Sequence, residues 1–253
     1  MSLWKLLEEG VAQDPSAPAI ASGEPALSYA ELRARIVRLA RELTLLGVEV
    51  GDRVAILAGN GCPFLEAYFA CAGLGAILVP LGTRLAPAEW RMLLIHSEAK
   101  WLLVGDGWTD AAKRIPLPDT TRIADLRSGA GPRLQPWGQT PPALSASNRW
   151  IPHDVSAETV AQIYYTSGTT GDPKGVMLTH GNVTQHARWA IDEFALGAGD
   201  TWGHFAPMFH LADAWATFAA TAVGAQHAFL AQFEAQAALD RIQSAGVTLT
   251  NLV

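Results

Sequence analysis

A dense run of glycines, hydroxyl-bearing residues and one lysine occupies residues 165–180, which read YTSGTTGDPKGVMLTH. Glycine lets backbone N–H groups approach an anion closely, and side-chain hydroxyls add hydrogen-bond donors. Lys174 adds a mobile positive charge on a long side chain, which suits phosphate oxygens. This composition predicts a loop that binds a polyphosphate. Its hydroxyls are those of Thr166, Ser167, Thr169 and Thr170.

Two other interpretations of this loop are weaker. A flexible surface linker would not need Pro173, which stiffens the backbone beside the lysine. A Walker A loop also sets glycine and lysine against phosphates, but it requires glycine directly before the lysine and serine or threonine directly after it. Here Pro173 precedes Lys174 and Gly175 follows it, so the Walker A interpretation fails.

The same segment resembles the phosphate-binding signature of the adenylate-forming superfamily, which includes acyl- and aryl-CoA synthetases, luciferases and peptide-synthetase adenylation domains. Three further blocks resemble blocks of that family and follow in its order. They are ALSYAEL at 26–32, GLGAILVPL at 73–81 continuing to Arg84 and Leu85, and APMFH at 206–210. The loop is highly specific, the other blocks support it jointly, and the four together cover nearly the whole chain.

The resemblance implies two half-reactions: ATP activates a carboxylic acid to an acyl-adenylate, and coenzyme A then takes the acyl group. Lys174 would act as a catalytic cation that follows the β- and γ-phosphates. Magnesium is expected to arrive with ATP, because hard oxygen ligands suit it, and Thr169 is the one candidate hydroxyl for it. The residues that would cradle the phosphates are Thr166, Ser167, Gly168, Thr169, Thr170 and Gly171.

The resemblance also assigns roles to the aromatic–histidine pair of the third block. Phe209 and His210 would lie beside the acyl group and the α-phosphate, and His210 would hydrogen-bond the carboxylate as a catalytic residue. The aromatic residues around this pair could line an acyl pocket or belong to ordinary core. His180 and His204 lack comparable support, so we assign them structural roles.

Composition excludes several classes of protein. The 253 residues are 49% hydrophobic and 17% charged, which is typical of a globular chain and not of a disordered one. The net charge is −6, so neither a nucleic-acid footprint nor a polybasic membrane patch is indicated. The most apolar stretch, residues 67–82, is interrupted by Pro80 and is shorter than the roughly 18–20 residues of a spanning helix.

Cysteine and histidine usage points to a reducing compartment without a dedicated zinc site. Cys62 and Cys71 are the only cysteines, too few for a disulfide scaffold, and we expect two buried thiols in a cytoplasmic protein. No CxxC or HExxH spacing occurs. The N-terminus turns acidic at Glu8 and Glu9 before any long apolar core, which argues against a secretory signal.

Alternating strand and helix signals must position these residues. Ser28 and Glu31 have capping-box spacing ahead of a helix that should stop at Gly47. The alternation predicts an α/β fold of layered, parallel-type sheets with flanking helices, which the resemblance identifies as the N-terminal part of the family's large domain. The expected strands are 53–58, 77–81, 101–104, 159–165, 201–206, 225–230 and 247–252, and the expected helices are 63–75, 87–96, 211–223, 233–245 and one that begins at His180 or Gly181.

We expect two α/β subdomains. The first covers residues 1–155, with an irregular proline-rich connection at 105–155, and the second covers 156–253 and carries the loop. Because the chain stops in an expected core strand and the resembled enzymes are about twice as long, we expect an N-terminal piece without its C-terminal domain. Such a piece should bind ATP weakly and turn over little, and its exposed sheet edge leaves pairing into a homodimer open.

Two alternatives to an acyl-CoA synthetase for fatty or aryl acids remain. One is an adenylation domain that loads a carrier protein, which the preferred thiol acceptor would distinguish. The other is a non-catalytic nucleotide-binding module, which Lys174→Ala would distinguish, because partner binding alone should not depend on that charge.

Overall fold

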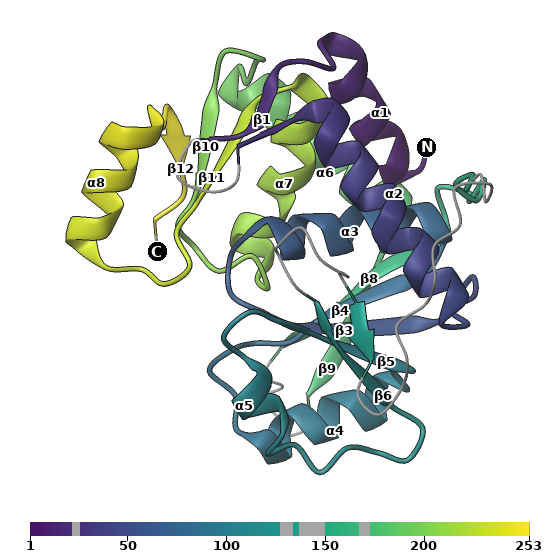
Figure 1. Ribbon diagram of the computed structural model, residues 1–253. Helices are drawn as coiled ribbons and strands as arrows, with labels where there is room; N and C mark the ends of the chain where they lie inside the picture. The colour runs from purple at the N-terminus through teal and green to yellow at the C-terminus, as the bar shows by residue number, and fades with distance from the viewer. Residues whose placement is uncertain (22–25, 127–133, 137–149, 167–172, 253) are drawn as a thin grey trace.

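The computed structural model describes residues 1–21, 26–126, 134–136, 150–166 and 173–252. Its strands form one sheet of seven strands and one of five, and helices pack on both (Figure 1). This arrangement confirms the predicted α/β fold of layered sheets with flanking helices. Among the helices in these ranges, none combines the length and the apolar character that crossing a membrane requires.

The seven-stranded sheet has the order β7-β6-β5-β3-β4-β8-β9. Its inner strands are parallel, whereas β7 and β9 pair antiparallel at the two edges. Parallel strands are covered on both faces, and β3 and β5 accordingly read as nearly continuous apolar runs. The strands are β3 (Arg53–Leu57), β4 (Ile77–Pro80), β5 (Trp101–Gly105), β6 (Arg122–Leu126), β7 (Leu134–Pro136), β8 (Val160–Thr166) and β9 (Lys174–Thr179).

The five-stranded sheet has the order β12-β10-β11-β1-β2, and β1 pairs in parallel with β11 through Ile20 and His227. Each sheet contains strands that precede residue 155 in the sequence and strands that follow it. The subdomain boundary expected at that residue therefore does not coincide with the division between the two sheets. The strands are β1 (Pro18–Ile20), β2 (Leu27–Ser28), β10 (Thr201–His204), β11 (Gln226–Phe229) and β12 (Leu249–Thr250).

The helix α3 (Cys62–Leu74) is the centre of the main core, and every residue in it except Pro63 is buried. One face of the seven-stranded sheet packs on this core through Val54 and Ile56, whereas Ala55 and Leu57 face a second cluster around α4. Figure 1 shows α4 and α5 on the side of that sheet away from α3. The other helices are α1 (Leu3–Gln13), α2 (Tyr29–Leu45), α4 (Pro87–Ser97), α5 (Thr109–Ala112), α6 (His180–Phe194), α7 (Leu211–Val223) and α8 (Ala235–Ala245).

Local start and stop signals act as predicted. The Ser28 hydroxyl accepts from the Glu31 backbone N–H, and the Glu31 carboxylate accepts from the Ser28 N–H, which completes a capping box at the start of α2. Gly47 follows the end of α2 at a φ of +83°. Gly75 ends α3 at a φ of +69°, a left-handed conformation that favours glycine.

The structure differs from the sequence-based expectations at two places. The residues after the phosphate loop form β9, for which no strand was predicted, before α6 begins at His180 as expected. The core strand predicted at 247–252 was wrong in extent and burial. The observed β12 is a two-residue edge strand, its residues are half-buried, and Leu252 is 60% exposed. Little covers this edge, because α8 buries only Ala238.

Candidate functional site

A cavity of about 640 Å³ lies where the carboxyl ends of strands from both sheets meet. Ligands of open parallel α/β sheets bind at such edges, because strand ends deliver loops there without disturbing the core. The wall combines aromatic side chains with charged ones, so it suits a molecule with an apolar part and an anionic part. The lining residues are those of segments 58–61, 83–84, 105–108 and 230–233, together with Pro63, Phe205, Pro207, Phe209 and Leu252.

Asn60, in the loop between β3 and α3, clamps this edge together. Its amide nitrogen donates to the carbonyls of His204 and Ala206, each at 2.8 Å, and its oxygen accepts from the Met208 N–H at 2.8 Å. One side chain on the seven-stranded sheet therefore fixes the backbone that leaves β10 of the other sheet.

Tyr68 on α3 fixes the same backbone from within the core. Its hydroxyl donates to the Met208 carbonyl at 2.7 Å, so the Tyr164 hydroxyl, 2.8 Å away, must donate to Tyr68. Burial raises the pKa of the Tyr68 hydroxyl well above its usual range, and it therefore stays protonated and keeps both bonds.

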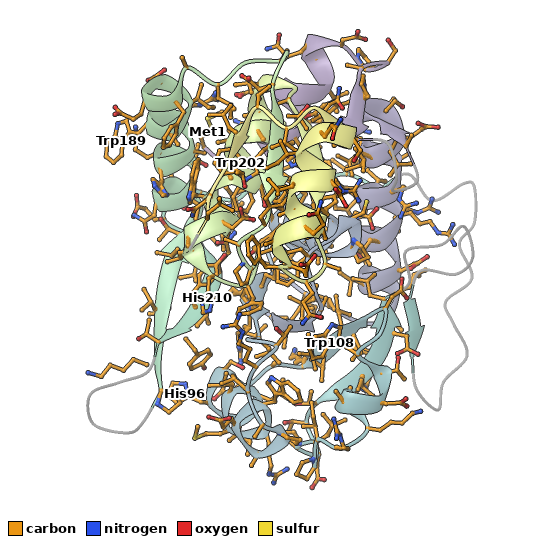
Figure 2. All side chains as sticks on the ribbon, turned by 90° about the vertical axis from the view of Figure 1, so that its left-hand side faces the viewer. Met1, His96, Trp108, Trp189, Trp202 and His210 are labelled. Atoms are coloured by element: carbon orange, nitrogen blue, oxygen red, sulfur yellow. The ribbon has the colours of Figure 1, made fainter. Side chains whose placement is uncertain are left out.

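The predicted Phe209–His210 pair lies at this edge, in two different environments. Phe209 is 8% exposed and lines the cavity. His210 is exposed, caps the start of α7, and its ring centroid lies 4.5 Å from that of Phe209. Partial loss of hydration, and then the positive charge of Arg84, lower the pKa of His210 below its usual value, so its ring is neutral at pH 7. Figure 2 shows His210 and Trp108 at the level where the upper and lower parts of the molecule meet.

The ends of the predicted phosphate loop are formed by a β-hairpin. Thr166 ends β8, Lys174 begins β9, and the two are paired across the ladder with exposed side chains. Tyr165, next to Thr166, is braced by α4, because its hydroxyl lies 2.8 Å from His96 Nδ1. In Figure 2, His96 lies beside the strands that lead into the loop. The other predicted loop residues, Ser167, Gly168, Thr169, Thr170 and Gly171, lie outside the described residues.

Sequence reasoning missed several residues of this site. Arg84 was noted only as part of a block, and Asn60, Tyr68 and Trp108 were not singled out. The one sequence signal for Asn60 is its place between two glycines directly after a buried strand, a position where side chains commonly reach a ligand site. For Tyr68 there was no signal, because it reads as one more apolar-face residue of a buried helix.

No metal centre is built from side chains within the described parts of the chain, where no group of three or more His, Cys, Asp or Glu side chains could hold an ion.

The sequence matches the AMP-binding enzyme family over residues 7–253. The chain belongs to this family. It is 38% identical over 198 residues to a feruloyl-CoA synthase of an Amycolatopsis species, which covers 78% of the chain and 37% of that protein. It is 36% identical over its whole length to an indoleacetate–CoA ligase of Aromatoleum aromaticum, of which it covers 50%.

The fold of this AMP-binding enzyme is shared with solved structures. The O-succinylbenzoate coenzyme A synthetase of Bacillus subtilis, in complex with AMP, superposes with a TM-score of 0.79 at 25% identity, over 97% of the chain and 60% of that structure. The chain spans half or less of the length of the two relatives above. The family assignment confirms the resemblance drawn from the loop and the three accompanying blocks.

Proposed function

We propose that the whole protein is an AMP-forming acid–thiol ligase that activates a carboxylic acid with ATP and transfers the acyl group to coenzyme A. The observation that carries this proposal is the cavity between the carboxyl ends of both sheets, with Phe209 in its wall and His210 at its border, in a chain of the AMP-binding family. The names of the two relatives, both of which form acyl-CoA thioesters, support the same reaction class.

In the first half-reaction, a carboxylate oxygen of the acid attacks the α-phosphorus of ATP. The bond from that phosphorus to the β-phosphate oxygen breaks and pyrophosphate leaves. In the second, the thiolate of coenzyme A attacks the acyl carbon and AMP leaves. Both steps depend on holding the reactants in line and on neutralising the departing phosphates, because the protein does little covalent chemistry itself.

The residues of this chain would supply the positioning and the charge. Lys174 stands exposed at the end of the hairpin that carries the loop, where its ammonium can reach β- and γ-phosphate oxygens. We propose the loop residues 166–171 as the cradle for these phosphates, with magnesium bound through the triphosphate and the Thr169 hydroxyl. A neutral His210 can donate to the acid's carboxylate through one ring nitrogen.

We propose an aromatic or fatty acid as the substrate. The aromatic side chains of Trp108, Phe205 and Phe209 line the cavity and offer flat apolar surface to an acyl group. The aromatic acids in the names of the two relatives, feruloyl and indoleacetate, favour the aryl class. The burial of both cysteines supports the cytoplasm as the setting of the reaction.

Acid-dependent exchange of labelled pyrophosphate into ATP tests the proposal. The protein from its uninterrupted native reading frame is offered aromatic acids and short, medium and long fatty acids. Exchange with one class would establish the adenylating step and name the substrate class together. Release of AMP with coenzyme A, but not with a carrier-protein thiol, would then identify the acceptor. No exchange with any acid, while ATP still binds, would instead indicate a non-catalytic nucleotide-binding module.

A further inference from the structure

A chain of polar side chains crosses the core behind Phe209 and His210. Asp213, His204, His227 and Thr221 have no exposed surface. Asp213 Oδ2 lies 2.6 Å from His204 Nδ1, His204 Nε2 lies 2.9 Å from His227 Nδ1, and His227 Nε2 lies 3.1 Å from Thr221 Oγ1. Because water cannot reach these groups, every one of these contacts needs its own donor and its own acceptor.

Thr221 sets the donor-to-acceptor direction of this series of hydrogen bonds. Its hydroxyl donates to the Thr217 carbonyl at 2.6 Å, and since a hydroxyl has one proton, its oxygen can only accept from His227. Burial, and then the neighbouring His204, lower the pKa of His227 well below its usual value, so that ring is neutral. A neutral His227 with its proton on Nε2 must accept at Nδ1, and His204 must therefore donate from Nε2.

One proton remains for the contact between His204 Nδ1 and Asp213 Oδ2. Trp202 Nε1 donates to the other carboxylate oxygen at 3.2 Å, and Asp213 lies in the first turn of α7, where unpaired N–H groups favour a negative charge. The His204 ring stacks on Phe229 with centroids 5.1 Å apart. A proton must lie between His204 Nδ1 and Asp213 Oδ2, because two lone pairs cannot face each other at 2.6 Å.

The other titratable groups close to Asp213 are Tyr68 and Tyr164. Burial is the main reason that the pKa of each is raised, and the charge of Asp213 adds to it. Both hydroxyls therefore stay neutral, and neither competes with His204 for the carboxylate.

The chain of bonds ties α7 to the five-stranded sheet at both of its ends. Asp213 lies in the first turn of α7 and Thr221 in the last, while His204 belongs to β10 and His227 to β11. The Asp213 N–H donates to the His210 carbonyl at 3.1 Å, so Asp213 also holds the residue that starts the helix. A displacement of Asp213 would therefore move His210 and, next to it, Phe209 in the cavity wall.

We propose that Asp213 and His204 are positioning residues that hold the first turn of α7, and with it Phe209 and His210, at the cavity. They do so as a buried hydrogen-bonded pair whose proton order is set by Thr221. The proposal rests on the proposed function for its effect on catalysis, but not for the arrangement of protons.

Histidine-ring NMR of the ¹⁵N-labelled 253-residue protein tests the arrangement of protons without any substrate. We expect a proton on Nε2 of His204 and a proton on Nε2 alone of His227. Thr221→Val removes the acceptor and should shift the His227 signals, while those of the exposed His186 stay in place. A His204 Nε2 without a proton, or the opposite tautomer of His227, would overturn the proposed arrangement.

Two substitutions of Asp213 then test positioning. Asp213→Ala removes the link, whereas in Asp213→Asn the amide oxygen can still accept from Trp202 and the amide nitrogen can donate to an unprotonated His204 Nδ1. In the whole protein, Asp213→Ala should raise the KM for the acid about tenfold and leave the KM for ATP within about twofold, because the hairpin that carries Lys174 is a separate element. Asp213→Asn should return the KM for the acid to within about threefold of the original.

The His210 ring signals provide a readout that needs no activity. They should move in Asp213→Ala, return toward the original in Asp213→Asn, and stay unchanged in Asp192→Ala, an exposed carboxylate on α6 that serves as the matched control. The positioning role would be overturned if the His210 signals did not move in Asp213→Ala, or if both Asp213 substitutions raised the KM for the acid equally. If Asp213→Ala does not fold, the histidine-ring NMR spectra of Asp213→Asn and Thr221→Val still test the proposal. Absence of exchange by the unmodified enzyme would count against the proposed function alone.

Discussion

Lys174 stands at the first residue of β9, paired with Thr166 and exposed, so its charge is presented at the end of a rigid hairpin. We propose that a charge held in this way follows phosphate oxygens during their departure.

Replacement of Lys174 by alanine should lower kcat for adenylate formation roughly 10²-fold, because one preorganised charge at the departing phosphates is lost. Pyrophosphate exchange in the whole protein measures the effect. Lys5→Ala, which removes an exposed lysine on α1, is the control and should leave exchange unchanged. If Lys174→Ala exchanged pyrophosphate at the rate of the unmodified protein, the catalytic role of this residue would be excluded.

His180 makes stability depend on pH. It is fully buried, its Nδ1 accepts from the Leu3 N–H at 3.2 Å, and burial, with the N-terminal amino group, lowers its pKa to about 4. In the unfolded chain the ring takes up a proton as the pH falls through about 6.5, whereas in the folded protein it does so only near 4. The free energy of unfolding therefore falls by up to about 3 kcal/mol as the pH drops from about 6.5 to about 4, and His180 lowers it no further below that pH.

The variant His180→Gln should remove that part of the pH dependence. The glutamine oxygen can accept from Leu3 but does not titrate, so the decline in unfolding free energy between pH 6.5 and 4 should be smaller by up to about 3 kcal/mol. Urea unfolding of both proteins across this range measures the difference. If the unfolding free energies of the two proteins had the same pH dependence, His180 would take up its proton at the same pH in the folded protein as in the unfolded chain.

At the scale of elements, the two sheets are joined at the site by side chains and not by a shared strand. Asn60 contacts the backbone of His204 at the end of β10 and of Ala206 and Met208 beyond it, and Tyr68 holds the Met208 carbonyl. This join sets the distance between the loops that line the cavity, so it controls the shape of the site.

Asn60→Ala should lower the unfolding free energy by roughly 2–4 kcal/mol, because three hydrogen bonds are lost and their backbone partners lie in a partly buried loop. Chemical denaturation measures the change. Asn251→Ala, which removes a single exposed hydrogen bond to the Ala212 carbonyl, is the matched control and should cost less than about 1 kcal/mol. Equal costs for the two variants would show that the clamp adds nothing to stability.

Elements with strong local signals were predictable from sequence, and contacts across the fold were not. The capping box of Ser28 and Glu31 and the glycine stop after α3 act within a few residues, so their outcome is decided locally. The strand β9 was missed because its residues gain their partner only by pairing with β8. The local sequence does not reveal the contacts of Asn60 and Asp213, since these depend on which strands become neighbours.

At the scale of the whole molecule, one core joins both sheets, and its centre holds the two cysteines. Cys62 and Cys71 lie on α3 and are 1% and 0% exposed. Burial also raises the pKa of the Cys71 thiol to about 12, which suppresses the reactive thiolate.

Neither thiol should react with a water-soluble disulfide reagent in the folded protein. We expect labelling of Cys71 to follow the rate of global unfolding, because no local opening of α3 is compatible with a core packed on both sides. Absorbance at increasing urea concentrations measures the rate. Rapid stoichiometric labelling in buffer would show that the core between the sheets opens locally.

The pairing of β1 with β11 has a consequence for how the chain is made. Ile20 must wait for His227, its parallel partner, to leave the ribosome, and most of the strands between them in sequence belong to the other sheet. At synthesis rates of 5–20 residues per second, this wait lasts roughly 10–40 seconds. For that time β1 is paired only with β2 and its other edge has no partner strand, so the protection of that edge depends on chaperones or on α1 and α2, which are made early and pack on each other.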